Sequence, residues 1–241
     1  MDALDRVAVA GRDLLKRVDT ALATAGAPAG DPIWPLLRSV GALPGDAFDF
    51  ALALDAEPLL SAAADLRVHA ERYAERRTEL AEHLGDRAWE GSGAEAFGAV
   101  WRALGAHIGD AQTADQPSLT GRLLAVASYL DSLAAWASEL RVELAMAIAA
   151  ALGSAEAVTL HSGPPPTVGG LFETVTNVSM DTTVPRAAST IGVRILGVVA
   201  DGLRAGQNLH DEWAPWLAEV PYRPPTDTGA AGFSPVTRVE L

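Results

Sequence analysis

The side chains able to do chemistry in this chain are its histidines, serines and carboxylates, and none has the spacing of a known reactive site. The histidines form neither a His-Glu-x-x-His pair nor another close pair suited to a metal ion. Glu79 and His83 share a helix face, which indicates a surface pair, and His83 and His107 would meet only as surface packing. We therefore expect no metal site. The five histidines are His69, His83, His107, His161 and His210.

Nucleophilic and phosphate-binding motifs are also missing. The Gly-Ser-Gly triplet at Ser92 is not a nucleophile elbow, which needs Gly-x-Ser-x-Gly between a strand and a helix. The glycines at 26–30 lack the Lys-Ser/Thr ending of a phosphate loop. Asp49, Asp55 and Glu57 are best interpreted as a solvated helix end. The sequence thus predicts no catalytic residue, no cofactor and no enzyme activity.

Composition narrows the class of protein further. The 241 residues are 49% hydrophobic and 20% charged, enough for a sizeable core. The net charge of −13 argues against binding to nucleic acid or to anionic membranes, both of which need a basic surface. Lys16 is the only lysine, which is typical of a GC-rich bacterial genome. The absence of cysteine excludes disulfides and thiol chemistry.

Targeting signals are not apparent. The N-terminus begins with acidic residues, so we expect no conventional signal peptide. The longest apolar stretch, residues 145–152, is too short to span a bilayer. The predicted location is therefore the cytoplasm or outside the cell through a route without such a signal.

Hydrophobic periodicity predicts an all-α chain. Within residues 55–85, apolar residues step by four and three from Leu59 to Leu84 as a heptad seam that only Arg77 interrupts; Asp55 is the expected N-cap and Gly85 the stop. The helix over 117–152 has an apolar face too wide for one neighbour. The expected long helices cover residues 2–25, 55–85, 92–108 and 117–152 and a last segment after Thr183.

Glycine, proline and polar clusters predict the connections. Residues 26–32 form a loop, and 41–45 a turn after which Asp46 caps a short helix. Residues 109–116 interrupt the helical pattern. We expect an irregular segment at 153–184, with a short extended piece at 157–160, and a flexible tail at 221–241.

The most specific feature is the turn at Trp89 and Gly91, between two strongly periodic segments. Glycine allows unusual backbone angles, and tryptophan covers the corner with a large apolar ring. Ser92 and Glu95 have the spacing of a capping box that restarts the helix, and Phe97 begins its apolar stripe.

These residues resemble the WXG family of helical-hairpin proteins, which are partners and substrates of bacterial type VII (Esx) secretion. The similarity rests on Trp89, Gly91, Phe97 and the alanines at 94 and 96, within a hairpin region of residues 55–152. It implies an antiparallel hairpin that joins another hairpin in a four-helix bundle, with Trp89 and Gly91 at the turn. The export signal of the family, a tyrosine followed four residues later by an acid, is missing.

We therefore expect one elongated up-and-down bundle over residues 1–220, built on this hairpin. The predicted function is protein–protein interaction related to type VII secretion, with a helical protein or a second copy as partner. Trp213 and Trp216, which flank a proline, are candidate partner-binding residues. The alternatives are a cytosolic helical scaffold or chaperone-like binder, and an enzyme or toxin, for which the C-terminal third offers no reactive constellation.

Overall fold

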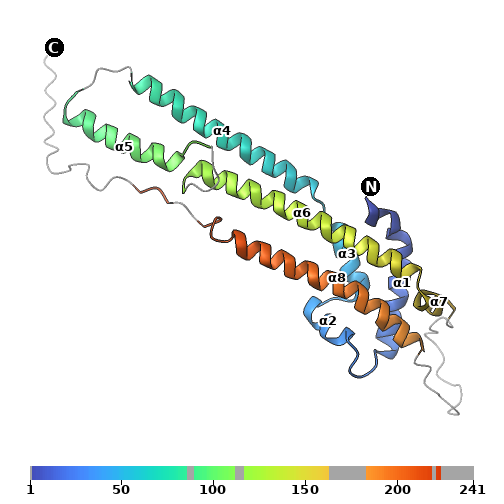
Figure 1. Cartoon of the computed structure of the whole chain (residues 1–241). Helices are drawn as coiled ribbons and strands as arrows, with labels where there is room; N and C mark the ends of the chain where they lie inside the picture. Colours follow the sequence, from blue (N-terminus) through green and yellow to red (C-terminus); the bar gives the residue numbers. More distant parts are fainter. Residues whose placement is uncertain (1, 86–89, 112–116, 163–182, 219–220, 224–241) are drawn as a thin grey trace, which may run out of the picture. The chain divides into compact units, whose positions relative to one another are not determined.

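A computed structural model describes residues 2–85, 90–111, 117–162, 183–218 and 221–223, and all regular structure within these ranges is helical (Figure 1). The prediction of an all-α chain is confirmed. The helices are α1 Ala3–Ala25, α2 Ile33–Val40, α3 Pro44–Ala53, α4 Glu57–Gly85, α5 Ser92–Ile108, α6 Leu119–Leu152, α7 Ala155–Ser162 and α8 Thr183–Trp213.

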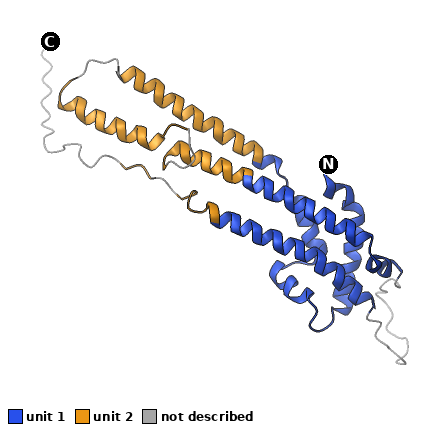
Figure 2. Ribbon diagram, viewed as in Figure 1, with its two compact units in different colours: residues 1–59, 132–211 blue, residues 60–131, 212–241 orange. Residues whose placement is uncertain are grey.

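The chain divides into two compact units (Figure 2). Unit 1 combines residues 1–59 with 132–211, and unit 2 combines residues 60–131 with 212–241. Each unit is therefore assembled from segments that are distant in sequence. The single helical-bundle domain expected over residues 1–220 stays a prediction.

Unit 1 contains a core of large apolar side chains. Helix α1 begins at a capping box between Asp2 and Asp5 and buries one stripe that includes Leu4, Leu14 and Val18. Phe48 of α3 is fully buried, as are apolar residues of α6 and α8. The members that reach the centre from these four helices are Leu4, Leu14, Leu15, Val18, Phe48, Leu144, Ile148, Ile191, Ile195, Leu196 and Val199.

Three local predictions in unit 1 need correction. The short helix α3 begins at Pro44, after Leu43 in an extended conformation, so Asp46 lies in its first turn and does not cap it. Proline suits this first position because its missing N–H would have had no helical partner. The turn therefore ends earlier than expected, and an additional helix, α2, precedes it.

The expected extended piece at 157–160 is instead part of α7. The Ser154 hydroxyl accepts a hydrogen bond from the Ala157 N–H (3.3 Å), which caps the helix start. Ala157 and Leu160, three positions apart, are buried in the core of unit 1. Burial of this helical stripe outweighs the strand preference of Val158 and Thr159. Residues 163–182 of the predicted irregular segment lie outside the described residues.

Unit 2 consists of most of α4, helix α5, the first part of α6 and the end of α8 (Figure 2). Arg67 of α4 pairs with Asp131 of α6, and Arg77 of α4 donates to the Gly105 carbonyl of α5 (3.4 Å). The buried non-glycine residues that the structure describes in this unit all have small side chains: Ala63, Ala70, Ser118, Thr120, Ala125 and Ala127.

A polar junction joins the end of α5 to the start of α6. Gly109 ends α5 with a φ of 83°, a left-handed conformation that favours glycine. The Thr120 hydroxyl donates to the Ile108 carbonyl (2.8 Å) and accepts from the Ala111 N–H (3.2 Å). Ser118 caps α6 by accepting from the Gly121 N–H (3.1 Å). These bonds satisfy main-chain groups that the helix ends leave open.

Candidate interaction surfaces

The predicted hairpin turn is described only on its α5 side. Trp89 lies outside the described residues, so its place at the corner stays a prediction. Gly91 has a φ of 98° and is itself the N-cap of α5, which agrees with the expected need for glycine. Ser92 is therefore the first helical residue, and no side chain caps α5. The capping box of Ser92 and Glu95 is wrong, because the helix begins one residue earlier than it requires.

Helix α5 packs only partly against the rest of the described chain. It carries an apolar stripe through Phe97, Trp101 and Leu104, yet none of its residues is buried. Phe97 and Val100 are among the exposed large hydrophobic residues. A helix with such a stripe is normally stabilised by covering it against neighbours.

The heptad seam of α4 becomes less buried along the helix. Ala63 and Ala70 are fully buried, whereas Tyr73 and Leu80 are 48% and 51% exposed. Arg77 reaches α5, and Tyr73 and Leu80 lie four residues before and three after it. The three residues share one side of α4, so the seam stays half open beside its contact with α5.

The two candidate tryptophans near the C-terminus have different surroundings. Trp213 packs against Tyr129 with ring centroids 6.1 Å apart. Trp216 has a half-exposed side chain, and its main-chain carbonyl accepts from Arg122. Tyr222 lies edge-on to His107 at 5.4 Å. Of the predicted pair, Trp216 is the better candidate for contact with a partner, since Trp213 is more buried.

The most connected charged group of unit 1 is Arg141 of α6. Its side chain is 11% exposed and forms ion pairs with Asp2 (2.6 Å) and Asp5 (2.8 Å) at the start of α1. It also donates to three carbonyls at the end of α3, at 2.9, 2.9 and 3.1 Å: those of Ala51, Leu52 and Leu54. The hydrogen bond from Arg141 lowers the pKa of Asp2 to about 2. This network joins α6 to the start of α1 and the end of α3.

A second carboxylate, Asp19, lies against the start of α3. It accepts hydrogen bonds from the Gly45 N–H at 3.1 and 3.3 Å. Burial raises the pKa of Asp19 to about 6, and the negative charge of Asp46 adds to the rise, while the Gly45 hydrogen bond opposes it. The close approach requires glycine, because a Cβ at position 45 would collide with the carboxylate.

The other polar residues considered from the sequence have structural or surface roles. The exposed Glu79 carboxylate pairs with Arg76 (2.7 Å), and the His83 ring lies 2.7 Å from the Glu79 carbonyl. Asp49 pairs with Arg12 (2.8 Å). Asp55 accepts from the Glu57 N–H (3.0 Å), near its expected place at the start of α4. Within the described ranges, no group of three or more His, Asp or Glu residues is arranged to hold a metal ion.

By length and apolarity, no single described helix qualifies as a membrane span, although the bent pair α6 and α7 passes the same test when taken together.

No protein-family model, no curated protein and no solved structure matches this chain.

Sequence reasoning missed the role of Arg141 and the exposure of Tyr73 and Leu80. Arg141 had only a weak signal: it is one of two arginines in α6 and lies next to the seam residue Leu140, between Glu139 and Glu143. No sequence signal indicated that Tyr73 and Leu80 would be exposed, since a heptad pattern predicts that a helix face is covered but does not identify the partner that covers it.

Proposed function

We propose that this protein is a non-enzymatic interaction protein whose α4–α5 region binds a helical partner. The half-exposed seam at Tyr73 and Leu80 beside Arg77 carries the proposal. Helix α5, with no buried residue, adds a second apolar surface in the same unit. A partner helix on this side would cover apolar area that the described chain leaves in contact with water.

The finer proposal is a role in type VII secretion, as substrate, helper or partner subunit. It is supported by the resemblance of Trp89, Gly91 and Phe97 to the WXG motif and by the positive φ of Gly91 at the start of α5. The expected partner is then a small WXG hairpin protein or a second copy. A helical scaffold unrelated to secretion would use the same surface, so the experiment must separate binding from export.

The binding test places a photo-crosslinking amino acid at position 80 in the native host. We expect a crosslinked helical protein or a crosslinked homodimer, identified by mass spectrometry. A matched control places the same amino acid at Val9 of unit 1, which is 83% exposed. Equal crosslinking at both positions, or at neither, would reject the α4–α5 surface.

A double substitution, Tyr73→Asp with Leu80→Asp, tests the same surface without a probe. It should abolish the complex while the secondary structure is retained, since both side chains are half exposed. The control is Val9→Asp with Val158→Asp, which changes two exposed apolar residues of unit 1. A complex that survives the first pair contradicts the proposal.

Export is measured separately, by comparing culture filtrates of the host with those of a strain lacking its type VII ATPase. Loss of the protein from the filtrate of that strain supports the secretion role. A specific complex at position 80 with a protein that is neither a WXG hairpin protein nor a second copy, without ATPase-dependent export, supports the scaffold instead.

A further inference from the structure

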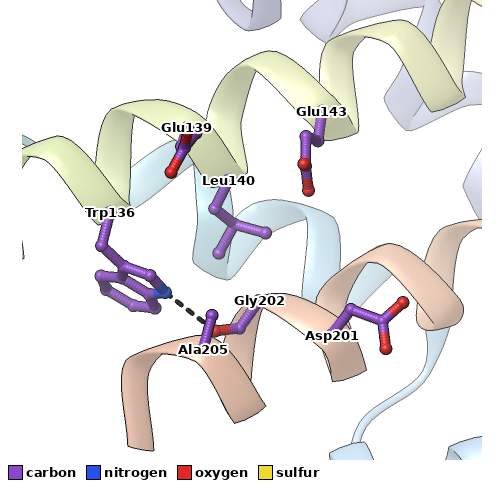
Figure 3. Close-up of a pocket in the computed structure, with 7 residues that line it drawn as sticks. All are labelled: Trp136, Glu139, Leu140, Glu143, Asp201, Gly202 and Ala205. Carbon is purple, nitrogen blue, oxygen red and sulfur yellow. Dashed lines mark hydrogen bonds between the residues drawn. The ribbon is translucent and has the colours of Figure 1, made fainter. Parts of the chain in front are cut away.

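Unit 1 carries a groove between the second half of α6 and α8, with a volume of about 210 Å³ (Figure 3). Its floor is apolar, formed by the indole of Trp136, by Leu140 and by small residues of α8. Carboxylates stand at its edges. The lining residues are Trp136, Glu139, Leu140, Glu143, Asp201, Gly202 and Ala205.

Small residues on α8 create this groove. The Trp136 indole N–H donates to the Gly202 carbonyl (2.8 Å), which fixes the ring across the two helices. A Cβ at position 202 would lie 2.6 Å from Leu140, so the helices approach closely at this point. Of the three α8 residues that line the groove, only Ala205 contributes an apolar side chain (Figure 3). Its single methyl group leaves the space beside Trp136 unfilled.

The rim of the groove is acidic. Glu139 and Glu143 lie four residues apart on α6, where like charges repel each other. Asp201 pairs with Arg204 (2.7 Å), but this pair is highly exposed and Arg204 does not line the groove. None of the lining residues is basic. The groove therefore combines an aromatic floor with the carboxylates of Glu139 and Glu143, for which no lining residue supplies a positive charge.

We propose that this groove docks an arginine side chain from a basic segment of another protein. Its volume is below the range of about 300–1,000 Å³ typical of pockets for small molecules and cofactors, and suits one long side chain. The methylene stem of arginine covers the exposed Ala205, and its planar guanidinium stacks on the indole and binds carboxylates.

Charge complementarity selects the partner. The chain itself has a net charge of −13, so a second copy would bring negative charge to a negative rim. A basic partner is instead attracted by the negative charge of the rim. Val142 and Met146 of α6 lie three and seven residues after Glu139 and are exposed, so apolar residues of the bound segment have a surface beside the arginine site.

This site is in unit 1 and is independent of the α4–α5 surface proposed above. A short alanine-based helical peptide with two arginines one turn apart serves as the probe. We expect it to shift the indole N–H resonance of Trp136 in a saturable manner at low salt, and less so as salt is added. The same peptide with citrulline in place of arginine should not bind, and a lysine version should bind more weakly.

Two variants separate the contribution of the rim from that of the floor. Glu139→Gln with Glu143→Gln should weaken the arginine peptide about fivefold, the sum of two partly exposed ion pairs. Ala205→Leu should weaken it at least as much by filling the groove without a change of charge. Glu71→Gln with Glu75→Gln, an exposed pair four residues apart on α4, is the matched control and should leave binding unchanged.

The proposal is overturned if the citrulline peptide gives the same shift, because recognition would then not depend on the guanidinium charge. Equal binding of the lysine peptide removes arginine as the occupant. A fivefold loss in the α4 control pair would show diffuse attraction to an acidic protein instead of a site. The Gln variants keep both side-chain lengths, so thermal melts should confirm that they fold.

Discussion

The two units of this protein bury side chains of very different size. The largest fully buried side chains of the described chain, led by Phe48, all lie in unit 1. In unit 2 the described buried residues other than glycine are alanines with one serine and one threonine. A fully buried Leu or Phe contributes about 1.5–3 kcal/mol, several times more than an alanine methyl. Unit 1 is therefore stabilised by its own core, and unit 2 has most to gain from a partner.

The largest contrast is expected between Phe48→Ala and Leu80→Ala. Removing the fully buried Phe48 ring should cost about 3–5 kcal/mol of unfolding free energy, because it leaves a cavity among packed residues. Leu80, half exposed, should cost less than about 1 kcal/mol. Urea unfolding followed by circular dichroism measures both. Equal losses would show that unit 2 depends on its large side chains as unit 1 does.

The same curves test whether residues 1–220 unfold as one domain. One domain predicts that fluorescence and circular dichroism report a single coincident transition, which Phe48→Ala shifts as a whole. Two separated transitions, with only one of them shifted by Phe48→Ala, would contradict it.

Next in size is Arg141→Met, which should destabilise the chain by about 2–3 kcal/mol. The three carbonyls at the end of α3 lose a donor that methionine cannot replace. The effect should also depend on pH. Because the folded-state pKa of Asp2 is lowered to about 2, its contribution is present above about pH 4 and lost as the pH falls toward 2. A wild-type and variant difference that stays constant from pH 5 to about pH 2 would contradict this account.

Gly109→Ala should cost about 2 kcal/mol and act on unit 2. The position has a φ of 83°, and an added methyl group would collide with the hydroxyls of Ser118 and Thr120. Hydrogen exchange should become faster at the junction of α5 and α6 while the α1 and α3 amides of unit 1 are unchanged. Gly98→Ala is the control, since a Cβ there meets nothing within 4 Å. If both variants exchange alike, the junction is not strained by the methyl group.

The smallest effect is expected for Asp19→Asn, which should stabilise the chain at pH 7 by about 1 kcal/mol. The pKa of Asp19 is raised from 3.8 to about 6, so the unfolded chain releases this proton first as the pH rises. Wild-type stability should therefore fall between about pH 4 and pH 6, and solvent at the half-buried carboxylate limits the size of the loss. Thermal melts across this range should show a flatter profile for the variant. An identical pH profile would mean that Asp19 keeps its ordinary pKa.

Helix positions followed from the sequence because periodicity and glycine or proline breaks are local signals. The ends of α1, α5 and α6 lie within two residues of those expected. The first turn of α5 was mispredicted because Gly91, one residue before Ser92, is its N-cap. Residues 157–160 were mispredicted because burial of Ala157 and Leu160 in the core of unit 1 makes them part of the helix α7. The groove on α6 was not predictable, since it depends on Gly202 and Ala205 of a distant helix facing Trp136.

The discontinuous make-up of unit 1 has a consequence for synthesis on the ribosome. Asp31 bonds to Ser189, 158 residues later in the chain, and Asp2 bonds to Arg141. At about 5–20 residues per second, α1 waits on the order of 10–30 s before α8 emerges. During that interval the apolar stripe of α1 has no completed core to enter. The nascent chain is thus a natural client for chaperones, even though the finished unit is the better packed of the two.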